Sequence, residues 1–202
     1  MTMRRKGMAV VVGVITFASA IFAVQAAGQG KAAAPAGYTT LFDGKNLSSF
    51  NMIGDANWRL ADGVVQADKG NGFLVTKNLY GDFQLKAEFW VDDDANSGVF
   101  IRCENPQMIT AMNAYEVNIF DKRPDQTYAT GAIVDVAKPL TPMKAGGKWN
   151  TFEITAQGPH MVVVLNGTKT VDAQNSKHSR GAIGLQYGAG VVKFRLVQIK
   201  AL

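Results

Sequence analysis

The chain has only one cysteine, Cys103, among its 202 residues. A single thiol excludes an intrachain disulfide, so the fold has to be held by its hydrophobic core, and a chain of this length can bury a sufficient one. Cys103 falls on a predicted strand, where alternation turns it toward the core. We interpret it as a buried and inert thiol.

Helical periodicity and clustered positive charge are also lacking. No amphipathic helix of useful length is evident. The formal net charge is +5, but without residues 1–26 the chain has 18 Lys and Arg against 16 Asp and Glu, a net charge near +2. Such a balance, with no basic cluster, gives no support for nucleic-acid binding.

The beginning of the chain has the pattern of a secretory signal peptide. Residues 4–6 are basic, residues 8–22 form an apolar run, and small residues precede Ala27. The run is shorter than the roughly 20 residues of a membrane span, and no cysteine near the cleavage point could carry a lipid. We predict a signal peptide at 1–26, a flexible linker at 27–37 and one domain at 38–202. The protein should be secreted or periplasmic, with no stable membrane insertion after signal removal; a retained N-terminal anchor is the alternative.

Short alternating apolar runs, separated by Gly, Asn and Asp turns, fill the domain. In residues 82–91, Lys86, Glu88 and Trp90 lie on the face opposite the apolar residues. Residues 98–104 should turn Phe100 and Arg102 outward. Further runs lie at 39–42, 58–60, 64–66, 72–76, 114–121, 131–136, 149–157, 161–165, 168–171, 182–186 and 191–199. About a dozen short strands in one domain predict an all-β, two-sheet sandwich.

Residues 114–121 form the most informative strand. Alternation places Tyr115, Val117 and Ile119 on a core face, with Glu116 and Asn118 on the other face, about 7 Å apart at ~3.4 Å per residue. A solvated sheet face can also carry such a pair. Asp121 ends the strand on the opposite parity, so it is either a rim residue or a turn cap.

Several stretches together resemble the 3-keto-disaccharide hydrolase domain family, long catalogued as a domain of unknown function. The order and spacing of these stretches, over nearly the whole domain, carry the resemblance: LFDGKNL (41–47), YGDF (80–83) with Glu88, NSGVFIR (96–102), YEVNIFD (115–121), TGAI (130–133), WN (149–150), LNG (165–167), IGLQ (183–186) and FR (194–195). The family implies a concanavalin A-like jelly roll that binds sugar across its concave sheet. It also implies hydrolysis or elimination at glycosides of 3-keto sugars, with divalent metals reported for members.

If the strands concerned share the concave sheet, their outward side chains converge on a sugar. Trp90 and Phe100 would then offer rings to a sugar face. The remaining residues expected to bind substrate are Lys86, Asn118, Gln186 and Asp121. The alternative is a set of exposed ion pairs, such as Lys86–Glu116 or Glu88–Arg102, each contributing only about 0–1 kcal/mol.

A ketone at C3 acidifies the C2 proton of the sugar, so elimination of the C1 substituent needs a base and a cation near the enolate oxygen. We assign Glu116 as base or metal ligand, Arg102 as the cationic stabiliser and Glu88 as a second carboxylate. A metal would take oxygen ligands such as Glu116, Glu88 or the 92–94 loop; the sequence does not choose among them. β-Glucanases of this fold carry Glu, then Asp two residues on, then a second Glu on one strand face. The same positions here hold Glu116, Asn118 and Phe120, so a conventional glucanase, which needs two carboxylates, is disfavoured.

The chain departs from the family pattern at a few positions. Tyr187 and Gly188 stand where members commonly have Asp and His, and Leu196 replaces an Asn. His160 and His178 lie in turn-like sequence, where we expect surface residues rather than replacements. These departures keep two alternatives open beside the enzyme: a non-catalytic carbohydrate-binding module and a surface-interaction domain.

Overall fold

The computed structural model describes residues 1–2 and 35–202. Residues 3–26 of the predicted signal peptide and residues 27–34 of the predicted linker fall outside the described part of the chain. Within the described part of the chain, no helix has the length and apolarity needed to cross a membrane. Its only helical segment is the 3-10 turn η1 (Gln126–Tyr128).

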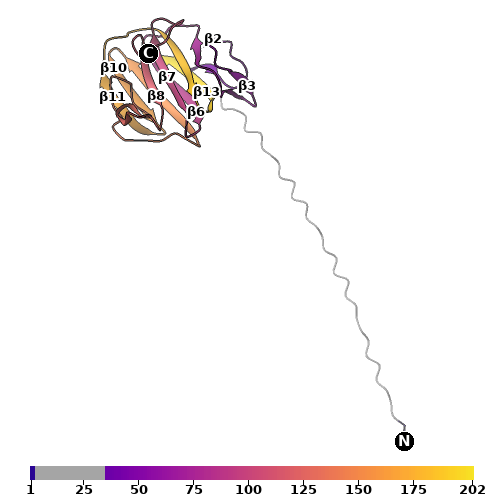
Figure 1. Ribbon diagram of the computed structural model, residues 1–202. Helices are drawn as coiled ribbons and strands as arrows, with labels where there is room; N and C mark the ends of the chain where they lie inside the picture. Colours follow the sequence, from indigo (N-terminus) through magenta and orange to yellow (C-terminus); the bar gives the residue numbers. More distant parts are fainter. Residues whose placement is uncertain (3–34) are drawn as a thin grey trace. The chain divides into compact units, whose positions relative to one another are not determined.

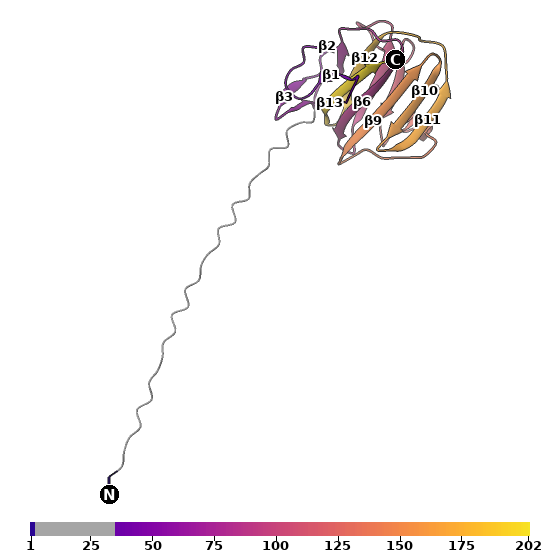
Figure 2. The ribbon, with the colours of Figure 1, turned by 180° about the vertical axis from the view of Figure 1, so that it is seen from behind.

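Two antiparallel sheets form the domain, and Figures 1 and 2 show them from opposite sides. Sheet A has the order β11-β10-β9-β6-β13-β4-β3, with β1 also paired to β13. Its strands are β1 (Thr39–Phe42), β3 (Arg59–Ala61), β4 (Val64–Ala67), β6 (Phe83–Val91), β9 (Trp149–Gln157), β10 (His160–Leu165), β11 (Thr168–Gln174) and β13 (Val192–Ala201). Sheet B has the order β2-β5-β12-β7-β8. Its strands are β2 (Phe50–Gly54), β5 (Gly72–Thr76), β7 (Asn96–Cys103), β8 (Tyr115–Ile119) and β12 (Ala182–Ala189).

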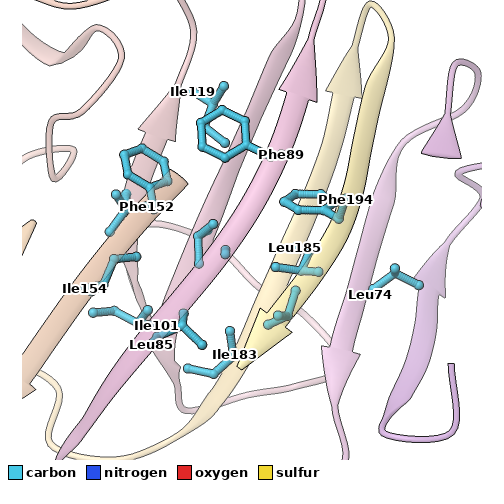
Figure 3. Packing of buried hydrophobic residues seen from close by; sticks show 14 of the residues in the cluster. Leu74, Leu85, Phe89, Ile101, Ile119, Phe152, Ile154, Ile183, Leu185 and Phe194 are labelled. Carbon is cyan, nitrogen blue, oxygen red and sulfur yellow. The ribbon is translucent and has the colours of Figure 1, made fainter. Parts of the chain in front are cut away.

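The core lies between the sheets and follows from the alternation of their strands. From sheet A, Phe89 packs against Phe152 and Phe194, with ring centroids 5.0 and 6.5 Å apart. Sheet B contributes Ile119 and Leu185, among other aliphatic residues, to the same cluster (Figure 3). These side chains are buried because each strand turns every second residue inward. The predicted two-sheet sandwich is therefore confirmed.

One predicted strand does not form as such. Residues 131–136 make only isolated bridges, in which Ile133 pairs with Val117 of β8 and with Ala137. The segment nonetheless lies along the free edge of β8, because Gly131 and Val134 donate backbone hydrogen bonds to the carbonyls of Asn118 and Glu116. It therefore covers an edge that would otherwise expose unpaired backbone groups.

A β-bulge near the end of β7 changes which residues face the core. Ala182 of β12 pairs with Cys103 and Gly184 pairs with Phe100, so two β7 residues oppose one residue of β12. Arg102, within the bulge, has φ 53°. The bulge turns Arg102 into the interior and brings Cys103 to the outer side of sheet B, in a second apolar cluster with Phe100. Cys103 is buried as predicted, but the face predicted for it and for Arg102 is wrong.

Candidate functional site

The candidate site lies on the outer face of sheet B, across β8, β7 and β12. In one row Glu116 pairs with Phe100, which pairs in turn with Gly184. In the next row Asn118 pairs with Gly98, which pairs with Gln186. Alternation thus brings together four residues predicted for the site: Phe100, Glu116, Asn118 and Gln186.

Glu116 is the most perturbed group of this face. The pKa of Glu116 is raised from 4.5 to about 7: burial is the largest cause, the nearby charge of Arg123 lowers the pKa, and the negative charge of Asp135 raises it. A carboxyl group of this kind is divided between its acidic and basic forms near neutral pH. It can therefore both take up and release a proton there.

Polar atoms around Glu116 are buried without a hydrogen-bond partner among the described residues. They are Oδ1 of Asn118, Oε1 of Gln186 and Nε of Arg123. The amide nitrogen of Asn118 donates to the Tyr128 carbonyl at 2.5 Å, which fixes the orientation of its side chain. Leaving a buried polar atom unpaired costs about 1–3 kcal/mol. Such a group of atoms is typical of a site that binds a polar ligand.

Small and apolar residues shape the floor of the face. Gly98 lies between Asn118 and Gln186, and a β-carbon there would come within 3.3 Å of Cγ of Glu116. At Gly184 a β-carbon would lie 3.0 Å from Cδ1 of Ile109, so the Ile109 side chain packs directly over this glycine. The face thus combines small and apolar residues with polar groups on both sides of Gly98.

An aromatic pair lies on the same face, toward β5. The ring of Phe73 meets that of Phe100 edge to face, with centroids 5.2 Å apart. Phe73 remains partly exposed, whereas Phe100 is buried. The partly exposed ring offers an apolar contact for the carbon face of a sugar.

Lys86, Glu88 and Trp90 lie elsewhere, so the predicted convergence on one face is wrong for them. β6 pairs with β9 and β13 in sheet A, and its non-core residues face away from the core on the far side of the sandwich. Glu88 accepts a hydrogen bond from Nε of Arg195 at 2.6 Å. Alternation gave the face of these three residues correctly, but it cannot tell which sheet a strand joins.

Arg102 is a structural residue, so its predicted role as cationic stabiliser of the site is also wrong. Only 1% of the residue is exposed. Its guanidinium donates to the carbonyls of Gly81, Gly158 and His178 at 3.1, 2.7 and 3.1 Å. It also pairs with Asp82 at 3.0 Å. These bonds join three connecting segments and leave the group directed away from Glu116.

Asp121 acts as a cap rather than as a sugar ligand. Its carboxylate accepts hydrogen bonds from Oγ1 of Thr130 and from the backbone nitrogens of Ala145 and Gly146, at 2.5 to 3.1 Å. The turn-cap alternative is therefore the right one. A cavity of about 670 Å³ beside Asp121 is lined by residues 126, 127, 129, 130, 138–140 and 142–144. Because the Asp121 carboxylate already accepts these hydrogen bonds, it is less available to bind a ligand in the cavity than Glu116 is on the outer face of sheet B.

The two histidines occupy different surroundings. His178 is buried, contrary to our expectation; its Nδ1 lies 3.0 Å from Oε1 of Glu104, and its ring contacts Tyr115. His160, at the start of β10, lies 2.8 Å from Asp172 on sheet A and remains accessible. Neither replaces the family histidine on the Glu116 face.

The residues at the family's Asp-His positions differ in direction. Tyr187 is in the core and its hydroxyl donates to the Gly190 carbonyl at 3.0 Å. Gly188 lies beside Asn96, whose backbone oxygen would be 3.0 Å from an added β-carbon. The position that would direct an imidazole outward is therefore a glycine here.

The arrangement does not fit a divalent metal. The described residues include no cluster of three or more His, Cys, Asp or Glu that could hold an ion. Glu116 has the positive charge of Arg123 beside it, and Glu88 is on the other sheet. In the acidic loop, Lys122 pairs with Asp94 at 2.6 Å and Val191 donates to Asp92. Hard cations prefer several convergent oxygen ligands, and none of these places provides them.

Sequence reasoning missed Arg123, Asp135, Phe73 and Ile109. The first two lie in loops after β8, where no periodicity applies. Phe73 is on β5, which was predicted as a strand but not as a neighbour of β12. Ile109 comes from the segment between β7 and β8. Only the tertiary arrangement places all four around the outer face of sheet B.

Solved structures similar to this chain include candidate glycosyl hydrolases and a carbohydrate-binding module. A candidate glycosyl hydrolase from Parabacteroides distasonis ATCC 8503 has 27% sequence identity to this chain and a TM-score of 0.70, over 82% of this chain and 99% of that one. A second from the same organism has 22% identity and a TM-score of 0.73, over 82% and 94%. The carbohydrate-binding module CBM66 from Bacillus subtilis shares the fold at 18% identity and a TM-score of 0.59, over 82% and 96%.

The family follows from a match to its model. The 3-keto-alpha-glucoside-1,2-lyase-like domain matches residues 37–200, so the chain belongs to this family. The resemblance seen in the sequence is thereby confirmed. A search of curated proteins finds no match.

Proposed function

We propose that the protein cleaves glycosides of 3-keto sugars, with Glu116 as the proton-transfer group on the outer face of sheet B. The observation that carries this proposal is a carboxyl group with a pKa near 7 among buried, unpartnered polar atoms. Membership of the lyase-like family and similarity to a candidate glycosyl hydrolase support it. Location outside the cytoplasm, secreted or periplasmic, is part of the same proposal.

The proposed reaction is an elimination. Ionised Glu116 takes the proton from C2, and the C–H electron pair forms a C2–C3 double bond with negative charge on the C3 oxygen. The guanidinium of Arg123 stabilises that charge. The electron pair then forms a C1–C2 double bond as the C1–O bond breaks, and the leaving oxygen takes the proton from Glu116. The products are an unsaturated 3-keto sugar and a free alcohol; later addition of water gives net hydrolysis.

Asn118 and Gln186 would orient the sugar in this scheme. Their free oxygens are acceptors, so they suit donation from sugar hydroxyl groups. Phe73 would contact the apolar face of the ring. Each sugar hydroxyl bound in this way would relieve the cost of a buried acceptor.

A non-catalytic carbohydrate-binding module is the second candidate. It is favoured by Gly188 at the family's His position and by similarity in fold to a carbohydrate-binding module. It needs the same face but no proton transfer. The two candidates therefore differ in turnover, and not in where the sugar lies.

The test measures release of free sugar from 3-keto-trehalose by the purified protein, and the absorbance of the unsaturated product. We expect Glu116→Gln to lower kcat by at least about 100-fold, with binding retained. Glu153→Gln, an exposed carboxyl on sheet A, is the control and should keep full turnover. Turnover that survives in Glu116→Gln would overturn the assignment; binding without turnover in the unaltered protein would favour the module.

Gly98→Ala tests the place of binding for both candidates. The added methyl group would lie 3.2 Å from the Val117 carbonyl oxygen and 3.3 and 3.4 Å from Cγ of Glu116 and Cε2 of Phe100, so it would displace the Glu116 side chain. We expect about a tenfold loss of sugar affinity, measured by calorimetry, with the fold retained as judged by circular dichroism. Unchanged affinity would show that the sugar lies elsewhere.

A further inference from the structure

The cavity beside Asp121, in the connection between β8 and β9, is a second place suited to a ligand. Its volume of about 670 Å³ falls within the roughly 300–1,000 Å³ of sites that bind small molecules. Residues 126–130, which include η1, form its first wall, and residues 138–144 form its second wall. We call this space the Asp121 cavity.

Hydrogen bonds of Asp121 hold the two walls together at one end. Its carboxylate accepts a hydrogen bond from Oγ1 of Thr130, the last residue of the first wall. It also accepts hydrogen bonds from the backbone nitrogens of Ala145 and Gly146, which directly follow the second wall. Because one carboxylate binds both segments, the distance between the walls is fixed without a ligand.

The second wall is also fixed along its length. Pro139 and Pro142 restrict its backbone dihedral angles. Between them, the backbone N–H of Leu140 donates to the Thr170 carbonyl of β11 at 2.7 Å. The cavity is therefore preformed, and a ligand that enters it would lose little affinity to the ordering of the protein.

Most of the surface that lines the cavity is apolar. Leu140 is 64% exposed although its backbone is hydrogen-bonded, and the partly buried Met143 packs against the main core. Ala129 and the two prolines of the second wall add to this surface. An apolar ligand would remove these groups from water, which is favourable in proportion to the area covered.

Two cations flank the apolar part of the second wall. Lys138 precedes it, Lys144 follows it, and both line the cavity. Neither ammonium group forms an ion pair or a hydrogen bond with another of the described residues. The carboxylate of Asp121 is the one acidic group in the lining. Two ammonium groups against one carboxylate leave one excess positive charge.

Other charged groups surround the cavity without lining it. Lys122 pairs with Asp94, and Asp93 lies against Gly146, beyond the end of the second wall. Asp125 caps η1 by accepting a hydrogen bond from its backbone. The others in this connection are Arg123, Asp135 and Lys148. The lining itself therefore determines which charge a bound ligand meets at short range.

We propose that the Asp121 cavity binds a small amphiphilic carboxylate. The apolar body of such a ligand would cover Leu140 and Met143, and its single negative charge would balance the excess charge of Lys138 and Lys144. A phosphate ester with two negative charges fits less well, because its second charge would be repelled by Asp121. A neutral sugar would leave both ammonium groups unpaired. The proposal does not depend on the function of Glu116, which lies outside this lining.

The test is calorimetric titration of the full chain with 2-naphthoate, compared with uncharged 2-naphthamide of nearly the same shape. We expect the carboxylate to bind at least about tenfold more tightly than the amide, and less tightly as salt increases. Lys138→Gln combined with Lys144→Gln should abolish this difference, and Leu140→Ser should weaken both ligands several-fold. Lys77→Gln, which removes one charge at an exposed position outside the lining, and Glu116→Gln should leave binding unchanged.

Several results would overturn the proposal. They are no binding of 2-naphthoate, equal binding of 2-naphthamide, unchanged binding in the double lysine variant, or tighter binding of 2-naphthyl phosphate than of 2-naphthoate. Loss of binding in Glu116→Gln would place the ligand on the outer face of sheet B and overturn it as well. If Leu140→Ser does not fold, as judged by circular dichroism, the lysine variants decide the matter, because exposed lysines are not needed for folding.

Discussion

At the scale of single residues, burial of the Glu116 carboxyl links the site to the stability of the fold. The folded protein holds the Glu116 proton up to a pH of about 7, whereas the unfolded chain releases it near 4.5. Between these values the folded state binds more protons than the unfolded state. The contribution of the Glu116 carboxyl to the free energy of unfolding is therefore fully present below pH 4.5 and is lost as the pH rises through about 7.

Glu116→Gln should remove this pH dependence. We expect the variant to unfold with a free energy similar to that of the unaltered protein near pH 4, and to be more stable by up to about 3 kcal/mol at pH 8, because the amide stays neutral. Urea denaturation at several pH values measures the difference. The exposed Glu153→Gln serves as control and should show no such divergence. Equal pH profiles for Glu116→Gln and the unaltered protein would mean that the carboxyl is not buried in solution.

At the scale of elements, the bulge in β7 determines which charged groups are structural. It removes Arg102 from the outer face and uses its guanidinium to join the segments around Gly81, Gly158 and His178. The cation beside Glu116 comes instead from the loop after β8, as Arg123. A single extra residue in β7 thus gives Arg102, which was predicted for the site, a structural role instead.

Arg102→Lys should destabilise the protein although it keeps the charge. One ammonium group cannot reach three carbonyls and Asp82 together, so buried acceptors lose their donors, and we expect a loss of about 3 kcal/mol. The urea midpoint measures it. Arg180→Lys, at an exposed position, should change stability by less than about 0.5 kcal/mol. A normal midpoint with lost turnover would instead assign Arg102 to the reaction.

The sequence allowed much of this to be predicted, for a physical reason. Alternation depends only on local backbone geometry, so the faces of Glu116, Asn118 and Lys86 were readable without a structure. The sheet that each strand joins depends on long-range pairing, so the separation of Trp90 from Glu116 could not be predicted from the sequence. The bulge at Arg102 could not be predicted either, because nothing in the local pattern requires it. Arg123 lies in a loop, where periodicity gives no information.

At the scale of the whole molecule, both sheets share one core, so they should unfold together. Trp90 and Trp149 report on sheet A, Trp58 reports on the core where it contacts Tyr187 and Phe194, and Cys103 reports on the outer side of sheet B. Burial raises the pKa of Cys103 to about 12, so its thiol is both covered and protonated at neutral pH. A probe of either sheet should therefore follow the same transition.

We expect a thiol reagent to leave Cys103 unmodified in the native protein and to react over the same range of urea in which tryptophan fluorescence changes. The two midpoints should agree within error. Cys103→Ala, which has no thiol, gives the background signal. Modification at lower urea than the fluorescence change would show that sheet B opens while sheet A remains folded.

The position of β13 has a consequence for how the chain reaches this state. β13 (Val192–Ala201) lies between β6 and β4 and also pairs with β1, so it joins strands from the first third of the domain. During synthesis, β1 and β4 therefore lack this partner until β13 has left the ribosome. The domain cannot fold progressively from its beginning, and its many distant pairings predict slow folding, in milliseconds to seconds. Sheet A therefore stays incomplete until β13 has emerged, which leaves its earlier strands open to chaperones over that interval.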